Sequence, residues 1–265
     1  MHRRSDQQII APPGQRSATL AALVRAWRAG LVSFDEVLDE TTDGEEHLVR
    51  HPDGTEEPLA ATLTSLTRLS PDAVRVVLPA AGDPRGLPGP GPFSSAALLA
   101  GEGVVLGTSG LVPEADLAPD ALLHPDDRWA GTRWLAHPLP STPAPAEPLT
   151  LAEADHDLTM ALTETVGALR DLDVARLPPG LAKGLAALRG ESAAGPSLPA
   201  GYGARARRLS ARATTIAGVL ALASADASGA AVNAFETSAR DAALRPLATA
   251  ARRARAAAVN APLER

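Results

Sequence analysis

The sequence contains no cysteine, and this absence excludes several kinds of chemistry together. Without thiols the chain has no disulfides, no thiolate ligands for a metal and no cysteine nucleophile. Long hydrophobic runs are also missing, because no stretch reaches the roughly 18 uninterrupted apolar residues that a membrane span requires. The first residues are basic but precede no apolar segment of signal-peptide length, so we expect a cytoplasmic protein without membrane contact.

Aromatic residues and lysine are scarce. Three Trp, three Phe and one Tyr occur in 265 residues, so the hydrophobic core must be built mainly from Leu, Val and Ala. Lys183 is the only lysine, and arginine supplies the remaining 24 of the 25 Lys and Arg residues. Apolar residues make up 45% of the chain and the net charge is only −6, which excludes wholesale disorder.

Charge and proline divide the chain into two parts. Residues 1–150 hold 20 acidic and 11 basic residues, whereas residues 151–265 hold 11 acidic and 14 basic ones. The change falls near the proline-rich segment STPAPAEP, which favours an extended linker. We therefore predict a flexible tail at 1–15, an acidic α/β domain at 16–140, a linker at 141–148 and an Ala/Arg-rich helical bundle at 149–261.

Short elements alternate in the N-terminal part. Apolar spacing predicts helices, Ser33 with Glu36 forms a capping-box pattern, and the run AVRVVL is typical of a buried strand. Strand, helix and strand between residues 73 and 107 have the length of a βαβ crossover. The predicted helices are 17–29, 33–40, 59–69 and 94–100, and the predicted strands are 47–50, 73–78, 103–107 and 133–138.

The C-terminal part has the pattern of long helices. An amphipathic stripe starts at Leu151 and continues for about six turns. Further helices are predicted at 181–188, 204–225 and 230–259, with a kink or restart at Pro246. The sequence therefore predicts an α+β or α/β protein, in which a small mixed sheet of about four strands precedes an all-α antiparallel bundle of three or four helices.

The loop GDPRGLPGPGPF at 82–93 is the most unusual local feature. It follows a buried strand and precedes a helix N-terminus, which is where open α/β sheets bind ligands. Asp83, Arg85 and Ser94 are the candidate ligand-binding residues, and an anionic ligand would suit them. The loop matches no phosphate-binding motif and its four prolines remove backbone donors, which favours a rigid structural connection instead.

The sequence contains no recognisable catalytic set and no metal site. The acidic run at 35–46 is more typical of a solvated face than of a metal site. His124, Asp126 and Asp127 stand close together in the sequence, but no nucleophile with a positioned base accompanies them. We therefore predict no catalytic residue, no metal and no other cofactor, and we favour a protein that is not an enzyme.

Arginine stripes mark two of the C-terminal helices, because spacings of three and four residues place side chains on one helix face. These candidate interaction residues are Arg205, Arg208 and Arg212 in one stripe and Arg245, Arg252 and Arg255 in the other. Such stripes can bind a nucleic-acid backbone. The acidic chain has few aromatics for base stacking, however, so we expect the stripes to lie near the acidic run at 35–46, within one chain or across a dimer.

Two segments resemble a group of uncharacterised proteins from GC-rich actinobacteria. The segments are AVRVVLPAAGDPRGLPGPGPFSSAALLAGEGVV at 73–105 and SGAAVNAFETSARDAALRPLATAARRARAAAVN at 228–260. They cover about a quarter of the chain, one in each half. The resemblance implies a bacterial, cytoplasmic protein, and it implies no activity and no residue roles.

Three functions are left open by the sequence. The leading hypothesis is a non-enzymatic adaptor that binds another protein or associates with itself. The alternative is an α/β domain that binds, or acts on, a small anionic molecule at the 82–93 loop. The second alternative is binding of a nucleic-acid backbone through the arginine stripes, which would weaken steeply with added salt.

Overall fold

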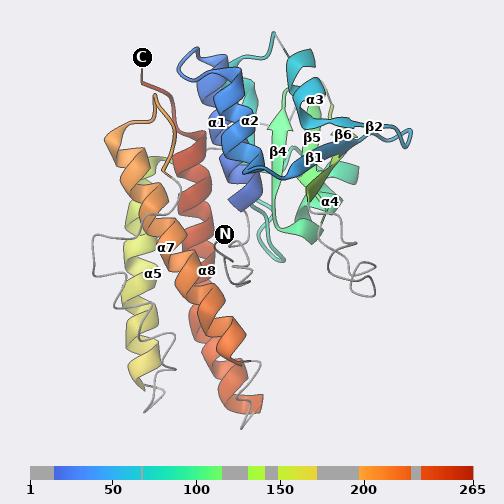
Figure 1. The fold of residues 1–265 in the computed structure, drawn as a ribbon. Helices are drawn as coiled ribbons and strands as arrows, with labels where there is room; N and C mark the ends of the chain where they lie inside the picture. The colour runs from blue at the N-terminus through green and yellow to red at the C-terminus, as the bar shows by residue number, and fades with distance from the viewer. Residues whose placement is uncertain are drawn as a thin grey trace, which may run out of the picture.

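The fold combines a mixed β-sheet with long C-terminal helices (Figure 1). The structure is a computed structural model that describes residues 15–66, 68–114, 131–140, 149–171, 197–227 and 234–264. The fold-class prediction, a mixed sheet followed by C-terminal helices, is confirmed. The predicted tail up to residue 14, the linker at 141–148 and the helix at 181–188 lie outside the described residues.

Six strands of the described residues form one sheet in the order β2-β1-β6-β5-β4-β3. The strands are β1 (Glu46–Arg50), β2 (Glu56–Pro58), β3 (Val74–Val77), β4 (Gly103–Leu106), β5 (Ser109–Pro113) and β6 (Gly131–Pro138). β1 and β6 are parallel, and the other neighbouring pairs are antiparallel. The sequence pattern did not predict β2 and β5, because β2 has only three residues and β5 contains glycine and proline.

The strand–helix–strand unit between residues 73 and 107 is not a parallel crossover, so that prediction is wrong. α4 (Pro92–Ala100) connects β3 to β4, but these strands are neighbours and run antiparallel. The chain turns back after β3 at Ala80 and Asp83, whose backbones bond to each other, and α4 ends at Gly101 in the left-handed conformation. The length of a connection is therefore compatible with either strand direction.

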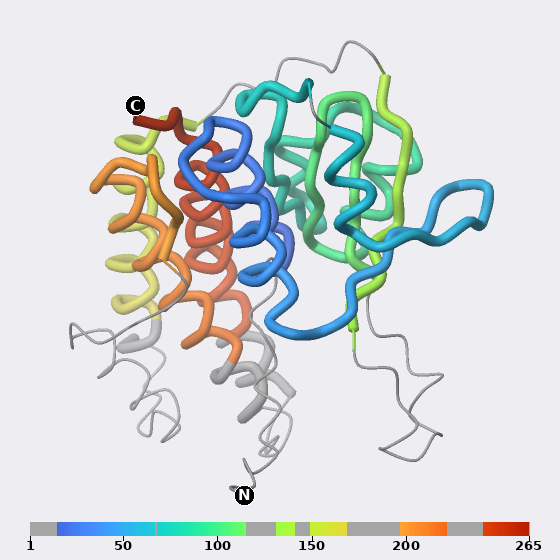
Figure 2. The backbone as a smooth tube through the Cα atoms, turned by 45° about the horizontal axis from the view of Figure 1, so that its top comes forward, coloured from blue at the N-terminus to red at the C-terminus, as the bar shows by residue number. Residues whose placement is uncertain are grey.

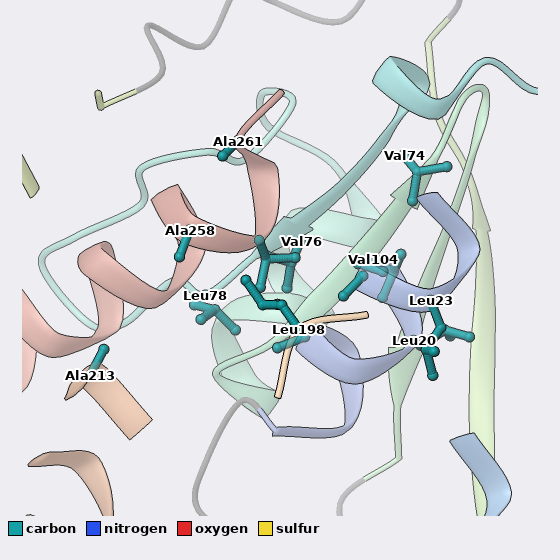
Figure 3. Packing of buried hydrophobic residues seen from close by; sticks show 14 of the residues in the cluster. Leu20, Leu23, Val74, Val76, Leu78, Val104, Leu198, Ala213, Ala258 and Ala261 are labelled. Atoms are coloured by element: carbon teal, nitrogen blue, oxygen red, sulfur yellow. The ribbon is translucent and has the colours of Figure 1, made fainter. Parts of the chain in front are cut away.

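Helices cover both faces of the sheet. On one face, α1 (Gln15–Arg28) and the C-terminal end of α8 (Ala234–Asn260) pack against β3 and its neighbours. Figure 3 shows Leu20 of α1 and Ala258 of α8 around Val76 and Val104 of the sheet. On the opposite face, α4 covers the sheet and Phe93 is buried in a smaller apolar cluster.

The remaining N-terminal helices are short. α2 (Phe34–Thr42) begins after Ser33, whose hydroxyl accepts a hydrogen bond from the Glu36 amide, so the predicted helix start is confirmed. α3 (Leu59–Ser65) contacts β1 and β2 and ends earlier than predicted. A single 3-10 turn at Pro71–Ala73 then leads into β3.

Three helices form an arm that extends beyond the sheet (Figures 1 and 2). α5 (Leu151–Asp171) and α7 (Ala204–Ala227) both pack along α8, which runs antiparallel to them. We call α5, α7 and α8 the arm. Within the described ranges, none of the helices is sufficiently long and apolar to cross a membrane.

Side chains from α1 and α8 complete the outer edge of β3. The Asn260 side chain donates to the Val76 carbonyl and accepts from the Val76 amide, both at 2.9 Å. Arg25 is 2% exposed and donates to the carbonyls of Val74 and Ala261, both at 2.8 Å. The sheet and the base of the arm therefore share hydrogen bonds as well as one hydrophobic core.

Candidate functional site

The loop after β3 is fixed to α8 by a charge cluster around Asp83. Asp83 is 8% exposed, and its carboxylate accepts hydrogen bonds from Arg252 Nη2 at 2.7 Å and from Arg253 Nε and Nη2 at 3.0 Å each. The paired bonds from Arg253 have the bidentate geometry of strong charge-assisted contacts. We call Asp83, Arg252 and Arg253 the loop latch.

The loop latch keeps the Asp83 carboxyl ionised. Burial raises its pKa, but the hydrogen bonds and charges of Arg253 and Arg252 lower it by more, so the pKa lies below its usual value. Arg85 Nε lies 3.7 Å from the same carboxylate, and its side chain is 65% exposed. Ser94 donates its hydroxyl to the Gly89 carbonyl. Asp83 and Ser94, two of the three candidate ligand residues, therefore bond within the chain.

On α7 the predicted arginine stripe has two kinds of surroundings. Arg205 and Arg208 are exposed. Arg212 is half-buried between α7 and α5, where its Nη1 contacts Asp155 Oδ1 and Thr159 Oγ1, both at 3.0 Å. Only part of this stripe therefore faces away from the other helices of the arm.

On α8 the predicted stripe is divided among three environments. Arg245 is exposed, and Arg252 belongs to the loop latch. Arg255 is 4% exposed, and its burial lowers its pKa while the charge of Glu102 raises it. A shared helix face does not make these residues one continuous surface, because neighbouring elements cover much of that face.

The acidic run at 35–46 does not supply the carboxylates that pair with Arg252 and Arg212. Its acidic side chains are exposed, while the carboxylates that pair with Arg252 and Arg212 are Asp83 and Asp155. One member of the run, Glu40, lines the same cavity of about 50 Å³ as Arg255. The other acids of α2 face solvent because this helix buries Val37. Pairing of the acidic run with the stripe arginines across a dimer stays a prediction.

A groove runs along the arm between α5 and α8 and has a volume of about 480 Å³. Its lining includes Ala161 and Ala250, which are buried, and Met160, which is 46% exposed. We call this surface the arm groove. It is lined by Asp157, Met160, Ala161 and Glu164 of α5 and by Ala242, Arg245, Pro246, Thr249, Ala250 and Arg253 of α8.

The two walls of the arm groove carry opposite charges. The α5 wall has the exposed carboxylates of Asp157 and Glu164, and the α8 wall has Arg245, which is exposed, and Arg253, which is 29% exposed. Within the described part of the chain, no ion pair joins the two walls. The groove therefore presents charges of both signs on its two walls.

A hydrogen bond between the helices defines which wall residues lie at the same height along the arm. Thr165 Oγ1 lies 3.4 Å from the carbonyl oxygen of Ala243, and α5 and α8 run antiparallel. From this contact, one residue back along α5 reaches Glu164, and two residues forward along α8 reach Arg245. These two residues therefore lie at nearly the same height along the arm. The same count places Asp157, about 10 Å farther along the axis, near the loop latch.

Proline leaves a backbone acceptor inside the arm groove. Pro246 lies within α8 and has no amide hydrogen, so the Ala242 carbonyl lacks the helical hydrogen bond from that position. Both residues are exposed and line the groove.

His47 of β1 is a buried histidine with an aromatic neighbour. His47 is buried beside Trp134, whose indole Nε1 donates to His47 Nδ1 at 3.3 Å, and burial lowers the pKa of His47 to about 4. Across the described ranges, no three His, Asp or Glu side chains gather in a way that could hold a metal ion. His124, Asp126 and Asp127 lie outside the described residues.

Sequence reasoning found Arg245 but missed the α5 wall of the arm groove. The predicted apolar stripe of α5 contains Leu158, which is buried in the core. Met160 lies off that stripe, with Asp157 three residues before it and Glu164 four residues after it. Spacings of three and four residues place these side chains together. A methionine between two acidic residues on the polar side of a helix could therefore have indicated this wall of the groove from the sequence alone.

Two family models match the chain, one in each half. The model described as Rv1486c-like protein, N-terminal domain, matches residues 17–149. The model described as Rv1486c-like protein, C-terminal domain, matches residues 152–256. Comparison with curated proteins and with solved structures gives no match. The first range contains the 82–93 loop, and the second contains the arm groove.

Proposed function

The chain belongs to the Rv1486c-like protein family, and we propose that it acts in the cytoplasm as a non-enzymatic adaptor that binds another protein chain through the arm groove. One observation carries the proposal. The groove combines an open trough of about 480 Å³, an exposed Met160 and charged walls of opposite sign. This membership agrees with the resemblance to an actinobacterial protein group, and no activity comes with it.

The shape of the arm groove suits a helix of the partner. Ala161 and Ala250 are small and buried in the lining of the groove, so a helix can approach closely. Helices pack at interaxial distances of about 8–10 Å, and the shorter distances require small side chains at the contact. Met160 is flexible and polarisable, and methionine adapts to the shape of a bound apolar surface.

The alternative site at the 82–93 loop receives less support from the geometry. An anion that bound Arg85 would also meet the Asp83 carboxylate, which lies 3.7 Å from Arg85 Nε. The bound anion and the Asp83 carboxylate would therefore repel each other. Asp83 itself is occupied by Arg252 and Arg253. We therefore assign the loop a structural role, which is to hold the sheet to the arm.

Site-specific photo-crosslinking in cells tests the proposal. A photoreactive phenylalanine analogue replaces Met160 in the arm groove or, as a matched control, Leu99, which is 89% exposed on α4. We expect a protein adduct from the Met160 position and none from the Leu99 position. Absence of an adduct from Met160, or equal adducts from both positions, would refute binding through the groove.

A further inference from the structure

We infer that the partner of the arm groove is a second copy of this chain, so that two arms pack face to face in a symmetric dimer. The inference rests on the proposed function, because it names the chain that the same surface binds. A dimer of identical chains uses one self-complementary patch, in which each contact occurs twice. The arrangement of charge on the two walls of the groove meets this requirement.

A twofold axis parallel to the helices brings opposite charges together. This operation places α5 of one copy over α8 of the other and leaves the height along the arm unchanged. Glu164 then faces Arg245 of the second copy, because the two residues lie at the same height. Asp157 faces the loop latch of the second copy, where Arg252 and Arg253 share the Asp83 carboxylate and Arg253 lines the groove.

The other twofold arrangement is unfavourable. An axis across the helices would place α5 over α5, and it would bring Glu164 of one copy over Asp157 of the other. It would likewise place Arg245 over the arginine-rich loop latch. Like charges in juxtaposition disfavour a complex. The charges of the groove therefore select one geometry, in which the four helices alternate in direction.

The centre of this dimer is apolar and small. Met160 of each copy would enter the trough of the other, between Ala161 and Ala250. Two adjacent helices present a face about 20 Å wide, and about 14 residues of each give a length of about 20 Å. The resulting area of about 400 Å² is below the roughly 800 Å² per partner of standard interfaces. We therefore expect a weak dimer that forms at micromolar or higher concentration.

Complementary charge reversal tests the inference. The E164R variant carries arginine at both contact positions, and the R245E variant carries glutamate at both, so each variant alone repels itself. We expect the dimer dissociation constant of each single variant to be about tenfold higher than that of the wild-type chain. An equimolar mixture of the two variants restores both contacts and should form a heterodimer.

Sedimentation velocity from about 1 to about 200 µM measures the outcome, a range that brackets a micromolar dissociation constant. The monomer mass is 27.2 kDa, and the dimer has twice that mass. As a control, R208E reverses an exposed charge on α7 outside the groove and should dimerise like the wild-type chain. Thermal melting of each variant at low concentration checks that the fold is retained.

Two results would overturn the inference. The first is a wild-type chain that stays monomeric over the whole range, and the second is dimerisation that both charge-reversal variants retain. The photo-crosslink at Met160 separates this failure from failure of the proposed function. An adduct with a different protein would leave the proposed function standing without self-association, whereas absence of any adduct would remove both.

Discussion

The loop latch makes a quantitative prediction for the Asp83→Asn variant. The substitution keeps the size of the side chain and one oxygen acceptor but removes the charge that holds Arg252 and Arg253. Breaking a buried ion pair at one partner costs about 3–5 kcal/mol. Here the Arg252 and Arg253 side chains are 20% and 29% exposed, so water compensates part of the loss. We therefore expect the free energy of unfolding to fall by about 2–3 kcal/mol.

Thermal unfolding at pH 7 provides the assay for this variant. In chains of this size, 1 kcal/mol corresponds to a Tm change of about 2–4 °C, so D83N should melt about 4–12 °C below the wild-type protein. The matched control is Asp155→Asn, which breaks the Arg212 pair. Those two side chains are 45% and 35% exposed, and exposed pairs contribute at most about 1 kcal/mol. The control should therefore lower Tm by less than about 4 °C.

The pH dependence of the same variant tests the physical reason. The pKa of Asp83 is lower in the folded chain than in the unfolded chain, because Arg253 and Arg252 favour the carboxylate despite its burial. Its contribution is therefore complete above about pH 5 and is lost as the pH falls through the folded-state pKa. The difference in stability between wild type and D83N should shrink below about pH 4. Equal melting temperatures at pH 7 would refute the reasoning.

Four further substitutions test the packing, a buried histidine and the edge of the sheet. Gly110→Ala places a Cβ 2.3 Å from the Phe93 ring and should cost about 1–3 kcal/mol in chemical denaturation, whereas Gly218→Ala enters open space in α7 and should stabilise by about 0.5–1 kcal/mol. Burial lowers the pKa of His47 to about 4, so the unfolded chain takes up the proton first and about 3 kcal/mol of stability should be lost between pH 6.5 and 4. The free energy of unfolding of the His47→Gln variant, measured by chemical denaturation, should not show this loss between pH 6.5 and 4. Asn260→Ala should speed hydrogen exchange at the Val76 amide by about 10-fold, and an unchanged rate would contradict the edge assignment.

Local sequence signals predicted the elements better than their arrangement. The Ser33 cap and the apolar run of β3 act within a few residues, so the sequence alone indicates them. The direction of β4 relative to β3 depends on where the loop turns back and on which face α4 covers, and neither is encoded in residue spacing. β2 is too short to show a period of two.

The sequence could predict the candidate site only where the spacing of arginines along a helix matches their exposure in the folded protein. The spacing of Arg245 along its helix indicated a surface residue, and Arg245 is exposed in the structure. The same spacing included Arg255, which is buried because α1 and α7 pack over it. Helical periodicity gives the direction of a side chain, but the element that covers it belongs to the tertiary structure.

The attachment of α8 explains why the arm can present a rigid surface. Near its C-terminal end, Asn260 bonds to the edge of β3 and the carbonyl of Ala261 accepts from buried Arg25, while the loop latch holds the helix two turns earlier. A helix fixed at successive points along its base has one direction relative to the sheet. A partner that binds the arm groove therefore meets a preorganised surface, and little conformational entropy is lost in ordering it.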